Sequence, residues 1–200
     1  HSVGFQYIYS RFALMTDWSN NNFKKEFYGQ LHELIEFYLN NPHITPCELF
    51  EYDISWTLEK RNFTAHCNVG NMQAYDFQTK KFYPCHMCFP SVCGDKLSNE
   101  FQKIELREDV EQCDKCCTEC PFINICLTCY AENYITRGSV SRRDLHLCSY
   151  KKIGFLALFQ YEYERIIQLE NPSSKDVMKM MAIQKWHAEL CEIEEYIFSN

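Results

Sequence analysis

Glycine and proline are scarce in this chain, with 6 of each among 200 residues. So little glycine excludes a collagen-like repeat, and so little of both excludes a low-complexity sequence. Acidic residues outnumber basic ones by 27 to 20, so we expect no basic surface for nucleic acid. No apolar run is long enough to span a membrane, and the first residues lack the features of a signal peptide. We therefore expect a cytoplasmic protein with neither a nucleic acid nor a membrane as partner.

Cysteine, by contrast, is abundant, with 13 residues. An odd number of thiols cannot all pair within one chain, and disulfide-dense domains are usually small, secreted and poor in core. This chain is 46% hydrophobic, which is enough for a core. Eleven cysteines lie between residues 67 and 148, with only Cys47 before them and Cys191 after them. This distribution predicts metal or iron–sulfur ligation, while Cys47 and Cys191 are expected to be buried thiols.

The first segment, residues 1–60, opens with an apolar and aromatic run at residues 3–9 that predicts a buried strand. Residues 23–39 carry apolar side chains at three- and four-residue steps, which predicts an amphipathic helix that Pro42 prevents from continuing. A single strand has no sheet to join. We therefore interpret this segment as the end of a larger α/β domain that begins upstream.

The second segment, residues 61–150, contains the cysteine cluster and is expected to form short strands near residues 72–77 and 81–83. The third segment, residues 151–200, has the apolar periodicity of two helices separated by a break at residues 171–174. The sequence therefore predicts an α+β fold in which a cysteine-rich domain with short β-hairpins precedes C-terminal helices.

The densest group of thiols has the pattern Cys117-x2-Cys120-x5-Cys126-x2-Cys129, and Cys148 follows it. Several cysteines on one loop let their thiolates converge on one metal centre, and a 4Fe-4S cluster needs four such ligands. Zinc ribbons separate their two CxxC pairs by roughly 12 to 20 residues, much more than the five residues found here. The spacing therefore favours an iron–sulfur cluster.

A zinc site is the alternative interpretation. Cys85-x2-Cys88 and Cys113-x2-Cys116 are two CxxC pairs with a wider separation. In that case the chain would be a zinc-stabilised, non-catalytic interaction module without a redox role.

The motif that runs from Cys117 through Cys129-Tyr130-Ala131-Glu132-Asn133-Tyr134, Gly138 and Arg143-Asp144 to Cys148 resembles the SPASM domain of radical SAM enzymes. Upstream, Cys67 and Cys85 match the start of the family pattern. Two positions depart from it: Lys80 stands in the glycine slot, and two residues rather than three separate Cys126 from Cys129.

Residues 17–42 also resemble the end of the barrel in SPASM-containing peptide-modifying enzymes. This likeness implies that residues 1–60 contain the last strand and helix of a partial (β/α) barrel. Residues 61–150 would then be the SPASM domain, and residues 151–200 a helical tail.

The resemblance implies two auxiliary 4Fe-4S clusters. The first would be bound by Cys67, Cys85 and Cys129, with Cys88 and Cys93 as the nearest candidates for a further ligand. The second would be bound by Cys117, Cys120, Cys126 and Cys148. Cys113 and Cys116 lie outside the pattern and are expected to be surplus thiols. His86 occupies the slot that resembles a catalytic aspartate in sulfatase-maturing relatives, which argues against that activity.

The triplet CxxxCxxC is absent from the sequence. In radical SAM enzymes this triplet binds the cluster that cleaves S-adenosylmethionine. We therefore expect a fragment, with that cluster and S-adenosylmethionine in the upstream barrel and with no catalytic residue here. The whole enzyme is expected to form a 5′-deoxyadenosyl radical and to modify a peptide or protein substrate, with a flavodoxin or ferredoxin as electron donor.

Overall fold

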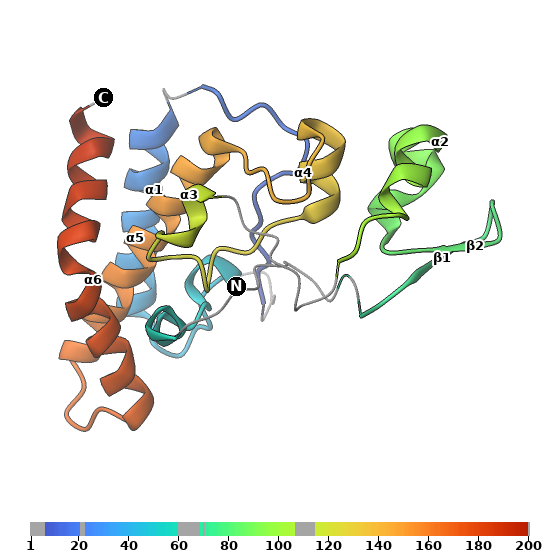
Figure 1. Cartoon of the computed structure of the whole chain (residues 1–200). Coiled ribbons are helices and arrows are strands. Elements are labelled where there is room, and N and C mark those ends of the chain that lie inside the picture. Colours follow the sequence, from blue (N-terminus) through green and yellow to red (C-terminus); the bar gives the residue numbers. More distant parts are fainter. Residues whose placement is uncertain (1–6, 21–22, 60–68, 70, 107–114, 200) are drawn as a thin grey trace. The chain divides into compact units, whose positions relative to one another are not determined.

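The structure, a computed structural model, describes residues 7–20, 23–59, 69, 71–106 and 115–199. The chain divides into two compact units, which we call the helical unit (residues 1–59 and 145–200) and the cysteine unit (residues 60–144). The described residues form six α-helices, three short 3-10 helices and one two-stranded antiparallel sheet (Figure 1). None of the helices in these ranges is long and apolar enough to cross a membrane.

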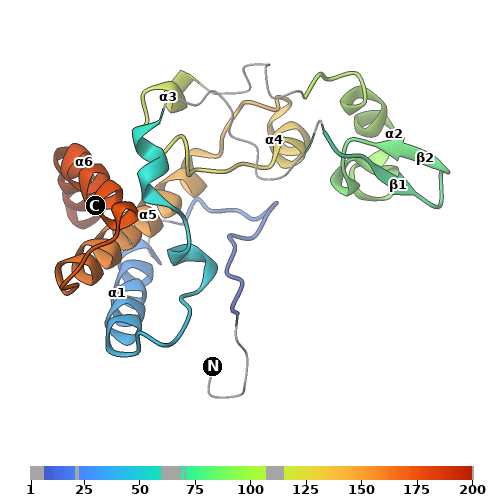
Figure 2. The same ribbon diagram turned by 90° about the horizontal axis from the view of Figure 1, so that it is seen from below.

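Three long helices lie side by side in the helical unit (Figures 1 and 2): α1 (Lys24–Asn40), α5 (Leu145–Ile167) and α6 (Ser174–Ser199). Helix α5 packs against both of the others, and it is buried along most of its length. The centre of this core contains the aliphatic side chains Leu31, Ile35, Ile153, Leu158 and Ala182. The apolar stripe of α1 faces α5. The helix predicted for residues 23–39 is confirmed, because α1 spans Lys24–Asn40.

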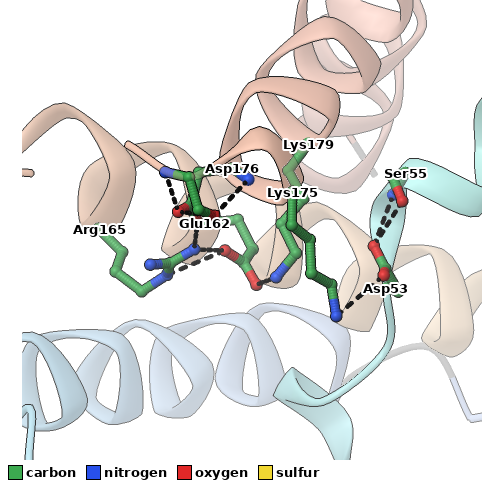
Figure 3. A network of polar contacts seen from close by, with 8 residues as sticks. Asp53, Ser55, Glu162, Arg165, Lys175, Asp176 and Lys179 are labelled. Atoms are coloured by element: carbon green, nitrogen blue, oxygen red, sulfur yellow. Dashed lines mark hydrogen bonds and ion pairs between the residues drawn. The ribbon is translucent and has the colours of Figure 1, made fainter. Parts of the chain in front are cut away.

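Two short 3-10 helices, η2 (Glu48–Phe50) and η3 (Ile54–Leu58), complete the helical unit. Cys47 precedes η2 and is buried, as expected, and its backbone N–H donates to the Tyr38 hydroxyl at 3.0 Å. Helix η3 contacts α6, and Trp186 Nε1 of α6 donates to Thr57 Oγ1 of η3 at 3.1 Å. Ahead of η3, Asp53 forms an ion pair with Lys175 of α6 (Figure 3).

A buried ionic network joins α5 to α6 (Figure 3). The Glu162 carboxylate accepts hydrogen bonds from the Arg165 guanidinium at 3.0 and 2.8 Å and from the Lys179 ammonium. Arg165 also contacts Asp176 near the start of α6. Because Glu162 is only 3% exposed, the negative charge of its carboxylate is stabilised by these two cations rather than by water.

The predicted C-terminal helices are confirmed, but α5 begins at Leu145, before the segment 151–200 to which the sequence assigned it. The predicted strand at residues 3–9 lies partly outside the described residues, and its described part, residues 7–9, has no regular secondary structure. That part of the prediction is wrong, and no barrel is present among the residues that the structure describes. The Ile8 carbonyl accepts one hydrogen bond, from Glu48 N–H at 3.2 Å, which is not a strand ladder.

The cysteine unit contains an antiparallel hairpin, with β1 (Ala74–Asp76) paired to β2 (Lys81–Tyr83) so that Ala74 lies opposite Tyr83. This confirms the two predicted short strands. Asp76 holds the turn by accepting from Gln78 N–H at 2.9 Å and from Thr79 Oγ1 at 2.8 Å. Lys80 then adopts a left-handed conformation with φ 55°, which is strained for a side chain with a Cβ and is favoured by glycine.

Helices α2 (Pro90–Phe101), α3 (Lys115–Thr118) and α4 (Tyr130–Arg137) belong to the same unit and are absent from the sequence-based prediction. Helix α2 begins with Pro90, which suits the first turn of a helix, and α4 ends at Gly138, whose φ is 71°. The core that α2 and α4 share with the hairpin is made of the buried side chains Val69, Tyr83, Cys88, Phe101, Leu106, Tyr130, Ala131 and Val140.

Candidate metal centre

Most of the described cysteines belong to the cysteine unit, and few of them are buried. Eight lie there, and Cys88 alone among these eight is classed as buried. The half-buried ones are Cys85, Cys93, Cys117, Cys120, Cys126 and Cys129, whereas Cys116 is exposed. Cysteine that serves only packing is among the most frequently buried residue types. The partial exposure of these side chains places them at the edge of the core, against which Cys85 and Cys129 pack, rather than in its interior.

Cys85 and Cys88 are brought together by the end of the hairpin. After β2, Cys85 precedes the 3-10 helix η4 (His86–Cys88), and the Cys88 backbone N–H donates to the Cys85 carbonyl at 3.1 Å. This single turn places both side chains on one side, with 3.5 Å between the two Sγ atoms. The CxxC spacing thus gives two adjacent thiols, as metal knuckles and redox pairs both require.

The core of the cysteine unit fixes Cys88 in place. Cys88 is 1% exposed, and its backbone carbonyl accepts a hydrogen bond of 2.7 Å from the buried Ser98 hydroxyl on α2. Next to it, Phe89 packs edge-on against Tyr83, with ring centroids 5.4 Å apart. Ser98 was not identified from the sequence, where nothing distinguishes this serine from the others. Together these contacts hold the CxxC turn against α2.

The two thiols differ in their acidity. A hydrogen bond from Cys88 lowers the pKa of Cys85 to about 6, and the Met87 backbone N–H and the charge of the exposed His86 act in the same direction. The same hydrogen bond, together with burial, raises the pKa of Cys88. The metal-free pair therefore favours one thiolate and one thiol at neutral pH, the protonation state that shares a proton between the sulfur atoms.

Cys93 lies near this pair, since burial and the charge of Cys85 raise the pKa of its thiol, but its sulfur contacts backbone carbonyls. Its Sγ contacts the Phe89 carbonyl at 3.5 Å and the Gly94 carbonyl at 3.7 Å, both within the first turn of α2. Of the two candidates for a further ligand beside Cys85, Cys88 is therefore the one whose sulfur lies next to it.

The second group of cysteines begins in α3 with Cys117 and continues on a compact series of turns. Cys120 N–H donates to the Cys117 carbonyl at 3.1 Å, and Cys126 N–H donates to the Phe122 carbonyl at 2.7 Å. Phe122 and Ile125 are each 1% exposed and anchor these turns, whereas Cys120 and Cys126 on either side of them are half-buried.

The remaining predicted ligands have different surroundings. Cys129 precedes α4, and its Sγ accepts a hydrogen bond from Glu132 N–H at 3.5 Å, the role of a helix N-cap. Cys148 is half-buried on α5, in the helical unit. Cys67 and Cys113 lie outside the described residues. Cys116 adjoins Cys117, with 3.9 Å between their sulfur atoms.

The donor set has the chemistry that iron–sulfur clusters and zinc both need, because every predicted ligand is a thiol. Within the described part of the chain, no group of three or more His, Cys, Asp or Glu side chains is close enough to hold a metal ion. Cys85 and Cys88, with 3.5 Å between their sulfur atoms, are two predicted ligands that the structure brings together.

Two further features of the helical unit differ from or go beyond the sequence-based prediction. Cys191 is exposed on α6, where its buried neighbour is Leu190, so the expectation that Cys191 is buried is wrong. A cavity of about 640 Å³ is lined in part by the aromatic side chains Phe12, Trp18 and Tyr150, a grouping that was not predicted from the sequence.

The chain matches no family model, and comparisons with curated proteins and with solved structures find no match either.

Proposed function

We propose that this chain is the auxiliary-cluster part of a radical SAM enzyme that modifies a peptide or protein substrate. Its cysteine unit would be a SPASM domain whose thiolates bind 4Fe-4S clusters. When bound, such a cluster supplies a redox centre that accepts or relays an electron, or an iron that positions the substrate. The observation that carries the proposal is the partial exposure of most thiols in a unit whose buried core contains one described cysteine, Cys88.

Two local features support the assignment to this family. Lys80 occupies the glycine slot of the family pattern, and its φ of 55° is the backbone conformation for which glycine is usually required. In addition, Cys129 begins α4 and Gly138 ends it, so the matched residues between Cys129 and Gly138 coincide with one helix. The motif therefore corresponds to a structural element and not only to a spacing.

The proposed ligands form two sets, one for each cluster. Cys67, Cys85 and Cys129 would hold the first cluster with Cys88 as the further ligand, and Cys117, Cys120, Cys126 and Cys148 would hold the second. Tyr83, Phe89 and Phe101 lie in or against the core beside Cys88 and would exclude water from that side of the thiols. The catalytic S-adenosylmethionine cluster would belong to residues upstream of this chain.

Metal analysis after anaerobic reconstitution with iron and sulfide tests the proposal. We expect about four irons per cluster, hence about eight with two clusters, and a brown protein. Cys120→Ala should lose at least about four of them, because one ligand of a cluster is removed. Cys191→Ala is the matched control, since it removes an exposed thiol that is not a proposed ligand and should leave the iron content unchanged. Equal iron in the two variants, or a colourless protein, would contradict the proposal.

A zinc-stabilised interaction module is the second candidate, and one distance favours it. Two thiolates on one tetrahedral zinc ion, with Zn–S about 2.3 Å, lie about 3.8 Å apart. The 3.5 Å between the Cys85 and Cys88 sulfurs is close to this value. Zinc near one equivalent in the protein as purified, with loss of that zinc in Cys88→Ala, would support this candidate over the cluster.

A further inference from the structure

The Cys85–Cys88 pair has a geometry with a second chemical consequence, which needs no metal. The sulfur atoms are 3.5 Å apart, and both thiols are free of disulfide bonds. The two side chains differ in exposure, because Cys85 is half-buried and Cys88 is enclosed. We propose that Cys85 and Cys88 form a thiol–disulfide exchange site for a low-molecular-weight disulfide, in which Cys85 attacks and Cys88 resolves.

The exposure of the two side chains assigns these roles. A disulfide in solution reaches Cys85, which lies at the surface end of the CxxC turn. It does not reach Cys88, because this residue is 1% exposed and is packed in the core with Tyr83 and Phe101. Exchange requires access of the attacking sulfur to the disulfide, so the first bond forms at Cys85.

Closure of the pair requires only a small movement. A disulfide bond is about 2.05 Å long, so the two sulfur atoms have to approach by roughly 1.5 Å. The backbone turn that joins them is already formed, with the Cys88 N–H on the Cys85 carbonyl, and Ser98 holds the Cys88 carbonyl. The third thiol nearby, Cys93, is directed to the carbonyl groups of Phe89 and Gly94 and is not the expected partner.

The reaction balances with the external disulfide, RSSR, as the oxidant. Cys85 Sγ attacks one sulfur of RSSR, which breaks the R–S–S–R bond, releases one RS⁻ and leaves a mixed disulfide on Cys85. Cys88 Sγ then attacks the Cys85 sulfur, which forms the Cys85–Cys88 bond and releases the second RS⁻. The two protons from the cysteines leave with the two RSH molecules, so the protein loses two electrons and RSSR gains them.

This site would also control metal loading, a consequence that rests on the proposed function. A disulfide between Cys85 and Cys88 removes both sulfurs from the ligands of the first cluster, because only thiolates bind iron or zinc. The exchange itself does not depend on that function and can be tested without it.

The test uses the full chain, reduced and freed of metal with a chelator, then treated with glutathione disulfide and digested with trypsin. The peptide that spans residues 82–96 contains Cys85, Cys88 and Cys93, and we expect Cys85 and Cys88 in it to lose two hydrogens and to carry no glutathione. Cys93→Ala is the matched control and should still lose two hydrogens. Cys88→Ala should instead retain glutathione on Cys85, and Cys85→Ala should retain at least about tenfold less on Cys88, since an enclosed thiol is a poor nucleophile.

The proposal is overturned if the wild-type peptide keeps its hydrogens, if Cys93→Ala abolishes the loss, or if Cys88 in Cys85→Ala reacts as fast as Cys85 in Cys88→Ala. The mass of the wild-type peptide decides the test even where a variant does not fold. Circular dichroism of each variant checks its fold. Iron content, measured on separate reconstituted samples, reports on the proposed function alone, so either idea can fail without the other.

Discussion

Replacement of Glu162 by glutamine tests whether the ionic network between α5 and α6 stabilises the helical unit. The substitution keeps the side-chain volume but removes the charge shared by Arg165 and Lys179. The Lys179 side chain is 12% exposed and that of Arg165 is 30% exposed, so the lysine loses most when its partner is gone. Breaking a buried ion pair costs about 3–5 kcal/mol. Because Arg165 keeps Asp176, we expect the lower end, about 3 kcal/mol.

Thermal unfolding followed by circular dichroism measures this change. A loss of about 3 kcal/mol corresponds to a melting temperature about 6–12 °C lower for a chain of this size. Glu192→Gln, an exposed glutamate on the same helix as Lys179, is the matched control and should change little. Adding Lys179→Met to Glu162→Gln should recover about 1 kcal/mol or more, since the uncompensated charge is then removed. If Glu162→Gln and Glu192→Gln melt at the same temperature, the network does not stabilise the unit.

Three other substitutions give independent checks. Hydrogen bonds from Ser173 and Arg165 lower the pKa of Asp176 from 3.8 to about 2, so its contribution to stability is present above pH 4 and disappears toward pH 2. Asp176→Asn should therefore flatten the fall of the urea midpoint between about pH 4 and pH 2. Lys80→Gly should stabilise the cysteine unit by about 0.5 kcal/mol in urea denaturation, since relief of the left-handed strain exceeds the entropy cost of glycine. Phe101→Ala should destabilise that unit by about 3–5 kcal/mol in the same assay, because its ring is fully enclosed.

The parts of the fold that could be predicted from sequence are those in which one face of an element is buried. Helix α1 follows its apolar stripe to within one residue at each end, and Asn41 and Pro42 mark where it stops. The start of α5 was missed because its first turns mix charged residues with the buried Leu147 and Tyr150. The strand prediction for residues 7–9 is wrong for a different reason: an apolar run forms a strand only where a partner strand exists.

The CxxC spacing predicted that Cys85 and Cys88 lie together, because residues three apart in a single turn share one side. It did not predict which of the two is enclosed. That depends on α2, whose Ser98 and Phe101 come ten or more residues later and hold the turn from the inside. The choice between Cys88 and Cys93 was likewise open in the sequence, and it depends on the backbone carbonyls that Cys93 contacts at the start of α2.

The cysteine unit shows why cysteine content alone does not indicate a chemistry. If its thiols served packing, they would replace Tyr83, Phe101, Phe122 or Tyr130 in the interior, yet these large side chains fill it. The aromatic residues form most of the core, and partly exposed cysteines are the kind that bind iron or zinc or exchange with another sulfur. Cys88 is the exception that joins both roles: its side chain lies in the core, and its sulfur lies 3.5 Å from that of the accessible Cys85. Substitution of Cys88 should therefore affect both the stability of the unit and the chemistry of Cys85, whereas substitution of Cys93 should affect neither strongly.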